Sequence, residues 1–173
     1  MKLMTLSAAA LVALTTFTLD ASAEGRLGGW RQNWAGGVTG GSVHNWTGPN
    51  GGTATGVRGG WTNGDGAGVF GSRGCVSGAA GQGCRAGVTT FDNGTVNHQS
   101  GFVAQGANGG SATSRGGFTR NADGTWAGAR ATDIIGPNGG SYAGQTTWDS
   151  QTGVTHTATC MDAYGKTVPC PTR

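Results

Sequence analysis

The chain has 173 residues, of which 37 are glycine, and its formal net charge at pH 7 is +3. After residue 23 it contains a single leucine, Leu27, and two isoleucines, Ile134 and Ile135, which excludes a conventional aliphatic core. The aromatic residues must supply most of the hydrophobic stabilisation, because each buries a large area at a small cost in rotamer entropy. A low net charge, with aromatic and β-branched residues recurring along the chain, favours ordered β structure over disorder.

Residues 1–23 are typical of a secretory signal peptide. Lys2 supplies the positive charge, residues 3–19 are largely apolar, and Ala21-Ser22-Ala23 fits a cleavage site. The apolar run is short for a membrane span and is interrupted by threonines. We therefore expect a secreted protein, extracellular or at the cell surface with the periplasm as the alternative, and no transmembrane segment after cleavage.

A five-residue glycine motif recurs after residue 47 with a period of about 27–31 residues. The motif Gly-Xaa-Asn-Gly-Gly occupies 48–52, 106–110 and 136–140, and a degenerate copy at 79–83 fits between the first two. A fixed period in this range indicates tandem supersecondary units that pack on their neighbours. We assign residues 48–165 to four glycine-rich β repeats and residues 166–173 to a C-terminal tail. Residues 24–47 form an atypical N-terminal lead, either a cap or a flexible leader.

Each repeat predicts two strands joined by an Asp/Asn-Gly turn, with the glycine motif as the turn into the next repeat. In the last copy the strands are 141–148 and 154–161, separated by Asp149–Gly153. An Asn-Gly pair suits a turn because it tolerates positive φ. The repeat-turn residues are Asn50, Gly51, Asn108, Gly109, Asn138 and Gly139.

The predicted strands alternate between two kinds of face. In 154–161, Val154, His156, Ala158 and Cys160 share one side, and threonines and a methionine occupy the other. Strand faces of Gly, Ala, Ser and Thr allow another sheet or chain to approach closely, as in flat stacked sheets.

The four cysteines, Cys75, Cys84, Cys160 and Cys170, predict two disulfide bonds, because an exported chain meets oxidising conditions. Four cysteines allow three connectivities. Pairing between sequence neighbours would close two loops of about ten residues each.

No residue set indicates catalysis, so we predict that the protein is not an enzyme. Neither GxSxG nor HExxH is present. Asp65, Asp92, Asp123 and Asp149 fall in predicted turns, where aspartate usually bonds its own backbone. With no CxxC pair, no recurring calcium nonapeptide and no phosphate-loop motif, we expect neither a metal nor a cofactor. The low positive charge, together with export, also argues against a nucleic-acid partner.

Aromatic residues recur at comparable positions of the four repeats, as Trp61, Phe91, Phe118 and Trp148. If buried, they form a packing ladder at the core of the repeats. If exposed, they form a platform for an envelope glycan. Thr155, Thr157 and Thr159 raise a third hypothesis, ice binding, but no regular Thr-Xaa-Thr ladder recurs across the units.

The sequence therefore predicts an all-β protein of tandem hairpin-like repeats, arranged as a meander, a β-solenoid or a flat two-layer stack. Glycine- and asparagine-rich tandem strands behind a signal peptide resemble bacterial extracellular fibre subunits in style, without the regular Gln/Asn spacing of curli repeats. The predicted function is structural: a secreted repeat protein that associates with itself at the cell surface or in the matrix. The alternative is an envelope-polymer or glycan-binding module.

Overall fold

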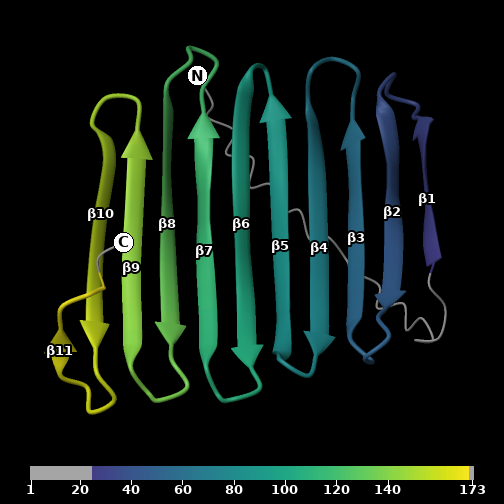
Figure 1. Ribbon diagram of the computed structural model, residues 1–173. Helices are drawn as coiled ribbons and strands as arrows, with labels where there is room; N and C mark the ends of the chain where they lie inside the picture. The colour runs from purple at the N-terminus through teal and green to yellow at the C-terminus, as the bar shows by residue number, and fades with distance from the viewer. Residues whose placement is uncertain (1–24, 172–173) are drawn as a thin grey trace, which may run out of the picture.

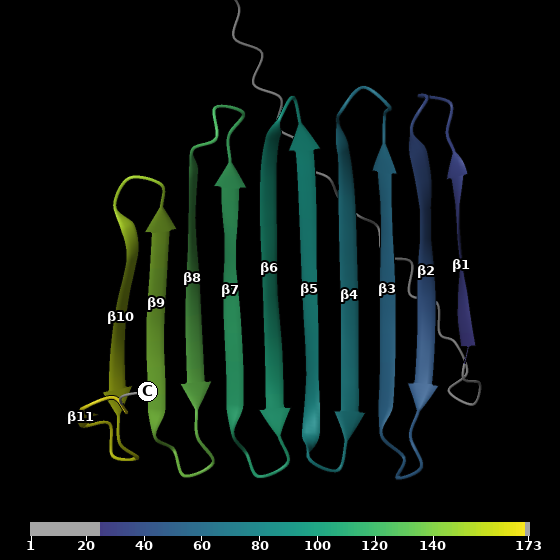
Figure 2. The same ribbon diagram turned by 45° about the horizontal axis from the view of Figure 1, so that its top comes forward.

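The computed structural model describes residues 25–171, which form a single antiparallel β-sheet. Eleven strands follow one another in chain order, each paired with the next, so the chain is a continuous meander without crossovers. Figure 1 shows the strands side by side in one layer, pointing alternately up and down, and the turned view in Figure 2 shows the same layer. Residues 25–171 contain no helix, and thus none long and apolar enough to cross a membrane.

Ten strands are long, and the eleventh is a two-residue strand at the C-terminal edge. Their bounds are β1 (Gly25–Gln32), β2 (Val38–Thr47), β3 (Thr53–Thr62), β4 (Gly68–Gly78), β5 (Gly81–Asp92), β6 (Thr95–Gly106), β7 (Ser111–Arg120), β8 (Trp126–Ile135), β9 (Ser141–Asp149), β10 (Gly153–Met161) and β11 (Thr167–Val168).

The described chain covers neither face of the sheet with a second layer, so it has no conventional core. Among residues 25–171, the side chains of Ser114 and Cys160 are buried, at 5% and 6% exposure, whereas Trp46 is 51% exposed. The prediction of an all-β repeat protein is confirmed. Of the three arrangements that the sequence allows, the structure has the meander, in a single layer.

The three intact glycine motifs form three nearly identical turns at one end of the sheet. In each, the first glycine N–H donates to the carbonyl of the fifth residue at 2.7 Å, and the fourth residue's N–H donates to the first carbonyl at 3.0–3.1 Å. The fourth residues, Gly51, Gly109 and Gly139, have φ of +74°, +87° and +84°. Glycine occupies this position because it adopts positive φ without steric cost, whereas a side chain there would strain the backbone.

The degenerate copy makes a tighter turn. Gly78 pairs with Gly81, so Ala79 and Ala80 alone connect β4 to β5. Gly81 has φ +135°, and a Cβ there would lie 2.2 Å from the carbonyl oxygen of Gln105. The connection is therefore a two-residue hairpin, which keeps β4 and β5 in the same continuous ladder.

Turns at the other end of the sheet are closed by Asn and Asp side chains. Oδ1 of Asp149 accepts from the N–H groups of Gln151 and Thr152, and Oδ1 of Asp123 accepts from the N–H of Thr125. In the turn at 63–67 the acceptor is Asn63, not Asp65: its Oδ1 bonds the N–H groups of Asp65 and Ala67, both at 2.9 Å. These bonds satisfy the turn backbone and fix where each strand ends.

Both ends of the described chain join the same sheet. The N-terminal lead forms the hairpin β1–β2, and Asn33 closes its turn by accepting from Ala35 and Gly37. The C-terminal tail forms β11, which pairs with Cys160 and Met161 at the end of β10. The signal peptide predicted for residues 1–23 lies outside the described residues.

Two disulfide bonds are present, as predicted, and they join sequence neighbours. Cys75 on β4 bonds Cys84, directly opposite on β5, and Cys160 on β10 bonds Cys170 beyond β11. The first bond joins two strands that are already paired, whereas the second holds the C-terminal tail against the edge of the sheet.

Removing the second disulfide should loosen the tail more than the sheet. In Cys160→Ser/Cys170→Ser we expect β11 to detach, with a loss of about 2–3 kcal/mol of unfolding free energy for a loop of this length. Hydrogen exchange should show Met161 and Thr167 losing protection while β4–β7 keep theirs. The matched variant Cys75→Ser/Cys84→Ser should leave the tail protected. Equal loss of tail protection in both variants would contradict this division.

Candidate functional site: an aromatic and arginine face

Strand register divides the side chains between two chemically different faces. Residues directly opposite one another across the strands form transverse rows that share a face, and successive residues of a strand alternate between faces. The row that begins at Trp30, here called the Trp30 row, crosses all ten long strands as Trp30, Gly40, Gly60, Phe70, Thr89, His98, Phe118, Gly128, Trp148 and Val154.

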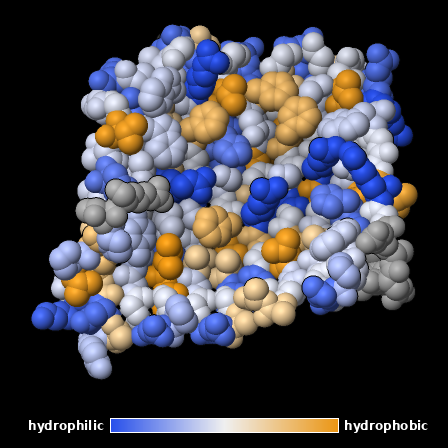
Figure 3. Space-filling model, in the orientation of Figure 1, coloured by the Kyte–Doolittle hydropathy of each residue, from blue (hydrophilic) through white to orange (hydrophobic). Residues whose placement is uncertain are grey.

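The face that contains the Trp30 row carries most of the aromatic side chains of the strands, and we call it the aromatic face. Its aromatic members are Trp30, Trp46, Phe70, Phe91, Phe102, Phe118, Trp126, Tyr142 and Trp148. The opposite face is the small-residue face, and Trp61 is its one aromatic residue in the described strands. Figure 3 draws one face, where orange hydrophobic side chains, several ring-shaped, are interspersed with blue hydrophilic ones.

Rings on the aromatic face lie flat over glycines, which explains how a sheet without a second layer is stabilised. A Cβ at Gly60 would lie 2.1 Å from the Phe70 ring, and one at Gly128 would lie 2.6 Å from the Trp148 indole. Each glycine is the direct cross-strand partner of the ring above it. The rings thus cover glycine backbone that would otherwise face water, an arrangement that also pins strand register.

The largest aromatic cluster spans strands β1 to β5. The ring centroids of Trp30 and Phe70 are 6.1 Å apart, and those of Phe70 and Phe91 are 5.8 Å apart with the rings nearly parallel. Trp30 reaches Phe70 across two intervening strands because both residues between them in the row are glycines. A second pair joins His98 and Phe118, with centroids 5.5 Å apart.

The structure separates the four residues of the predicted aromatic ladder. Phe118 and Trp148 share the Trp30 row, Phe91 lies two residues further along the same face, and Trp61 lies on the small-residue face. Trp61 follows Thr53 by eight residues, whereas Phe118 and Trp148 follow Ser111 and Ser141 by seven. A difference of one residue places a side chain on the opposite face.

A shallow hollow of about 460 Å³ lies on the aromatic face over β3 to β6. Trp30 and Phe70 line one side, Arg58 and His98 lie at its margins, and the floor is glycine and Ser72. Nε of Arg58 donates to Oγ of Ser42 at 3.0 Å. The hollow thus combines flat apolar rings with a cation whose partner is a neutral hydroxyl.

The small-residue face also contains a run of glycines. One of its transverse rows begins with four consecutive glycines, Gly29, Gly41, Gly59 and Gly71. Thr155, Thr157 and Thr159 also lie on this face, along β10. A second, smaller hollow of about 300 Å³ lies over β8 to β10.

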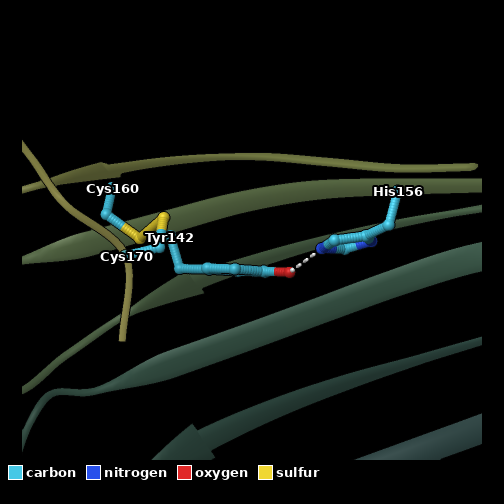
Figure 4. The surroundings of a disulfide bond; sticks show 4 residues. All are labelled: Tyr142, His156, Cys160 and Cys170. Carbon is cyan, nitrogen blue, oxygen red and sulfur yellow. Dashed lines mark hydrogen bonds between the residues drawn. A yellow bond between two sulfur atoms is a disulfide. The ribbon is translucent and has the colours of Figure 1, made fainter. Parts of the chain in front are cut away.

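Tyr142 lies beside the C-terminal disulfide bond on the aromatic face. Figure 4 shows its ring extending from beside Cys160–Cys170 toward His156. The Tyr142 hydroxyl lies 3.3 Å from Nε2 of His156, and Oγ1 of Thr146 lies 2.8 Å from Nδ1 of the same ring. The ring passes over Gly144, where a Cβ would lie 2.2 Å from the hydroxyl oxygen. The end of β10 is therefore held by a covalent bond and by ring contacts.

Titratable groups do not assemble into a catalytic or metal centre in the described part of the chain. Among residues 25–171, no three His, Cys, Asp or Glu side chains are close enough to hold a metal ion. His44, His98 and His156 share the aromatic face but lie on β2, β6 and β10. Hydrogen bonds from Thr152 and from Thr125 lower the pKa of Asp149 and of Asp123, respectively.

The lowered pKa of Asp149 predicts an acid-sensitive turn. A carboxyl whose folded pKa lies below its unfolded value of about 3.9 stabilises the fold above that pH, and the contribution disappears as pH falls through the folded pKa. Asp149→Asn should therefore lower the urea midpoint at pH 7, and this deficit should be smaller at pH 2. Thr152→Val, which removes the leading donor, should reduce the pH dependence similarly. An equal deficit for Asp149→Asn at both pH values would contradict this account.

Comparison with protein-family models, with curated proteins and with solved structures finds no match to this chain.

Proposed function

We propose that this is a secreted structural protein that assembles with copies of itself, edge to edge, into ribbons or filaments. The observation that supports this most strongly is the match between the two edge strands. All eight residues of β1 are exposed, and within the described chain β1 pairs on one side only, with β2. An unpaired strand edge is a template for another strand.

The opposite edge is open over seven residues, one fewer than the length of β1. β11 pairs with Cys160 and Met161, which leaves the outer edge of β10 from 153 to 159 without a partner among the described residues. In the transverse rows, Gly25 is level with Thr159 and Arg31 is level with Gly153. The seven open residues of β10 therefore occupy the same rows as seven residues of β1.

This match allows one copy to add to the next by simple translation. Ten long strands is an even number, so β1 and β10 run in opposite directions and a following β1 meets β10 as an antiparallel neighbour (Figure 1). Trp30 of the added copy would lie beside Val154, which continues the Trp30 row. β11 lies beyond the last of these rows, so it leaves the edge free for the incoming strand. Such a head-to-tail contact does not close and generates a filament.

The absence of a covering layer on the described sheet supports the same conclusion. In a single-layer sheet, each strand is stabilised chiefly by the strands paired with it. Each added copy forms one new pairing, between an edge strand of its own and an edge strand of the copy before it. The two disulfide bonds are compatible with an oxidising compartment outside the cell.

Size-exclusion chromatography with light scattering tests self-assembly on the oxidised chain lacking residues 1–23, followed by electron microscopy of the same sample. We expect oligomers that grow with concentration, and filaments whose diffraction has a spacing of about 4.8 Å along the axis, because the strands lie across it. A monomer at every concentration, across pH and salt, would overturn the proposal.

A further inference from the structure

Positive charge on the strands is concentrated on the aromatic face. Five arginines of the described strands lie on this face: Arg26, Arg58, Arg85, Arg120 and Arg130. The carboxylates of these strands, Asp92, Asp133 and Asp149, all lie on the small-residue face, which also carries Arg31, Arg73 and Arg115. The formal balance is therefore five positive against none negative on one face, and three against three on the other.

Two of these arginines stand at the ends of a trough on the aromatic face. On the aromatic face, the next transverse row after the Trp30 row contains Arg58 on β3 and Arg130 on β8. Between them it holds only small residues: Ser72, Gly87, Ser100 and Gly116. Five strand spacings, about 24 Å, separate the backbones of the two arginines. The Arg130 side chain runs back along the trough as far as Ser100 on β6, so its guanidinium lies closer to Arg58 than its backbone does.

The side chains on both sides of this trough are larger than those on its floor. Phe70, His98 and Phe118 of the Trp30 row line one side, and Arg85 and Phe102 line the other. The hollow of about 460 Å³ described above is the β3–β6 part of this trough. A chain molecule that is flat and a few ångströms wide would lie across the strands between the rings of the Trp30 row on one side and Arg85 and Phe102 on the other.

The arginines bordering the trough have neutral partners. Nη1 and Nη2 of Arg130 donate to Oγ of Ser114 and of Ser100, each at 3.0 Å, and Arg58 donates to Ser42. A guanidinium has five N–H donors in a planar fork that matches a carboxylate, so donors remain for a ligand. No strand carboxylate lies on this face among the described residues, so an anionic ligand would meet positive charge that the strands do not neutralise.

We propose that the trough between Arg58 and Arg130 binds an anionic polysaccharide, with its carboxylates on the arginines and its sugar rings against Phe70 and Phe118. Apolar faces of sugar rings pack on flat aromatic side chains, which bury large areas at small rotamer cost. The arginines stand far apart along the trough, which suits a polymer whose charges are separated by neutral ring atoms better than the dense phosphates of nucleic acid. The two disulfide bonds are compatible with such an encounter outside the cell.

A second copy of this chain does not fit the aromatic face equally well. Two aromatic faces in contact would oppose five arginines with five arginines, and like charges brought together without carboxylates are unfavourable. Binding in the trough is also independent of edge-to-edge assembly, because the edges of the sheet and its face are separate surfaces.

The test is calorimetric titration of the oxidised chain lacking residues 1–23, at concentrations below any assembly, with oligogalacturonate as the probe. We expect binding that weakens with added salt, and a neutral xylan oligomer of equal length should bind at least tenfold more weakly. Arg58→Gln/Arg130→Gln should weaken oligogalacturonate binding at least tenfold. The matched control Arg73→Gln/Arg115→Gln removes the same charge from the other face and should change it less than twofold.

A second pair of variants covers the case in which loss of Arg130 disturbs the fold, which circular dichroism would reveal. Ser72→Asp puts a negative charge on the trough floor, and Ser77→Asp puts one on the opposite face of the same strand. We expect the first to weaken binding at least tenfold and the second to leave it within twofold. No binding of oligogalacturonate at low salt, equal effects within either pair of variants, or tighter binding of single-stranded oligothymidine would overturn the proposal. If filaments fail to form but this pattern holds, the trough is retained and edge assembly is rejected.

Discussion

Placing lysine on both edges of the sheet, in Leu27→Lys/Thr157→Lys, should abolish assembly at concentrations where the unchanged chain forms oligomers. Leu27 and Thr157 end the same transverse row, so translation of one copy onto the next brings them directly opposite. Like charges directly opposite across two strands are destabilising, and lysine on an edge strand discourages pairing. Light scattering should report a monomer, and circular dichroism should report an unchanged sheet.

The partner variant Leu27→Lys/Thr157→Asp tests the register itself. It has the same positions changed, but opposite charges meet at each junction, so assembly should return. A shifted register would separate the introduced lysine from the introduced aspartate, and a slip of one residue would place them on different faces. If both variants assemble equally, or if both fail equally, the proposed row-matched junction is rejected even where filaments exist.

Strand positions could be predicted from the sequence because the local signals were strong. The Asn-Gly and Asp-Gly pairs between alternating segments mark turns, and the three glycine motifs form nearly identical turns in the structure. Alternation within 154–161 places Val154 and His156 on one side, as predicted, and the register shows that this side is the aromatic face.

The faces of the whole sheet could not be predicted in the same way. Whether two aromatic residues share a face depends on whether the number of residues in each intervening turn is odd or even. Trp61 follows the start of its strand by one residue more than Phe118 does, and this difference places Trp61 on the other face. The tight Ala79-Ala80 connection, with two residues in place of five, reverses this parity for β5, and the two-residue Asn93-Gly94 turn restores it for β6. Segregation of the arginines from the carboxylates is therefore a property of the assembled ladder that no single repeat reveals.

The number of layers could not be predicted from the sequence of individual strands either. Strands of Gly, Thr and aromatic residues are compatible with one layer or two, because each strand can bury its rings under a second sheet or over its own glycines. In the structure, Phe70 over Gly60 and Trp148 over Gly128 show the second solution. The high glycine content and the high aromatic content are thus linked, because these rings pack on backbone that carries no side chain.

This feature predicts opposite effects for the same substitution at two glycines. Gly60→Val should destabilise the sheet, because the new Cβ would lie 2.1 Å from the Phe70 ring and 2.8 Å from the carbonyl oxygen of Val69. Phe70 would have to leave its place against Phe91 and Trp30, and overpacking of this kind costs about 1–3 kcal/mol. Urea unfolding with the Leu27→Lys/Thr157→Lys background, which keeps the chain monomeric, measures the loss.

Gly71→Val is the matched control on the adjacent strand. Gly71 lies on the small-residue face, and a Cβ there would find its nearest neighbour, the carbonyl oxygen of Gly87, at 3.7 Å, an ordinary contact. Valine restricts the unfolded chain and favours a strand, so this variant should gain up to about 1 kcal/mol. The sign of the change therefore depends on what the new Cβ meets, which is a ring at Gly60 and no atom closer than 3.7 Å at Gly71. Equal losses at both positions would show that close backbone approach, not ring packing, explains the glycines.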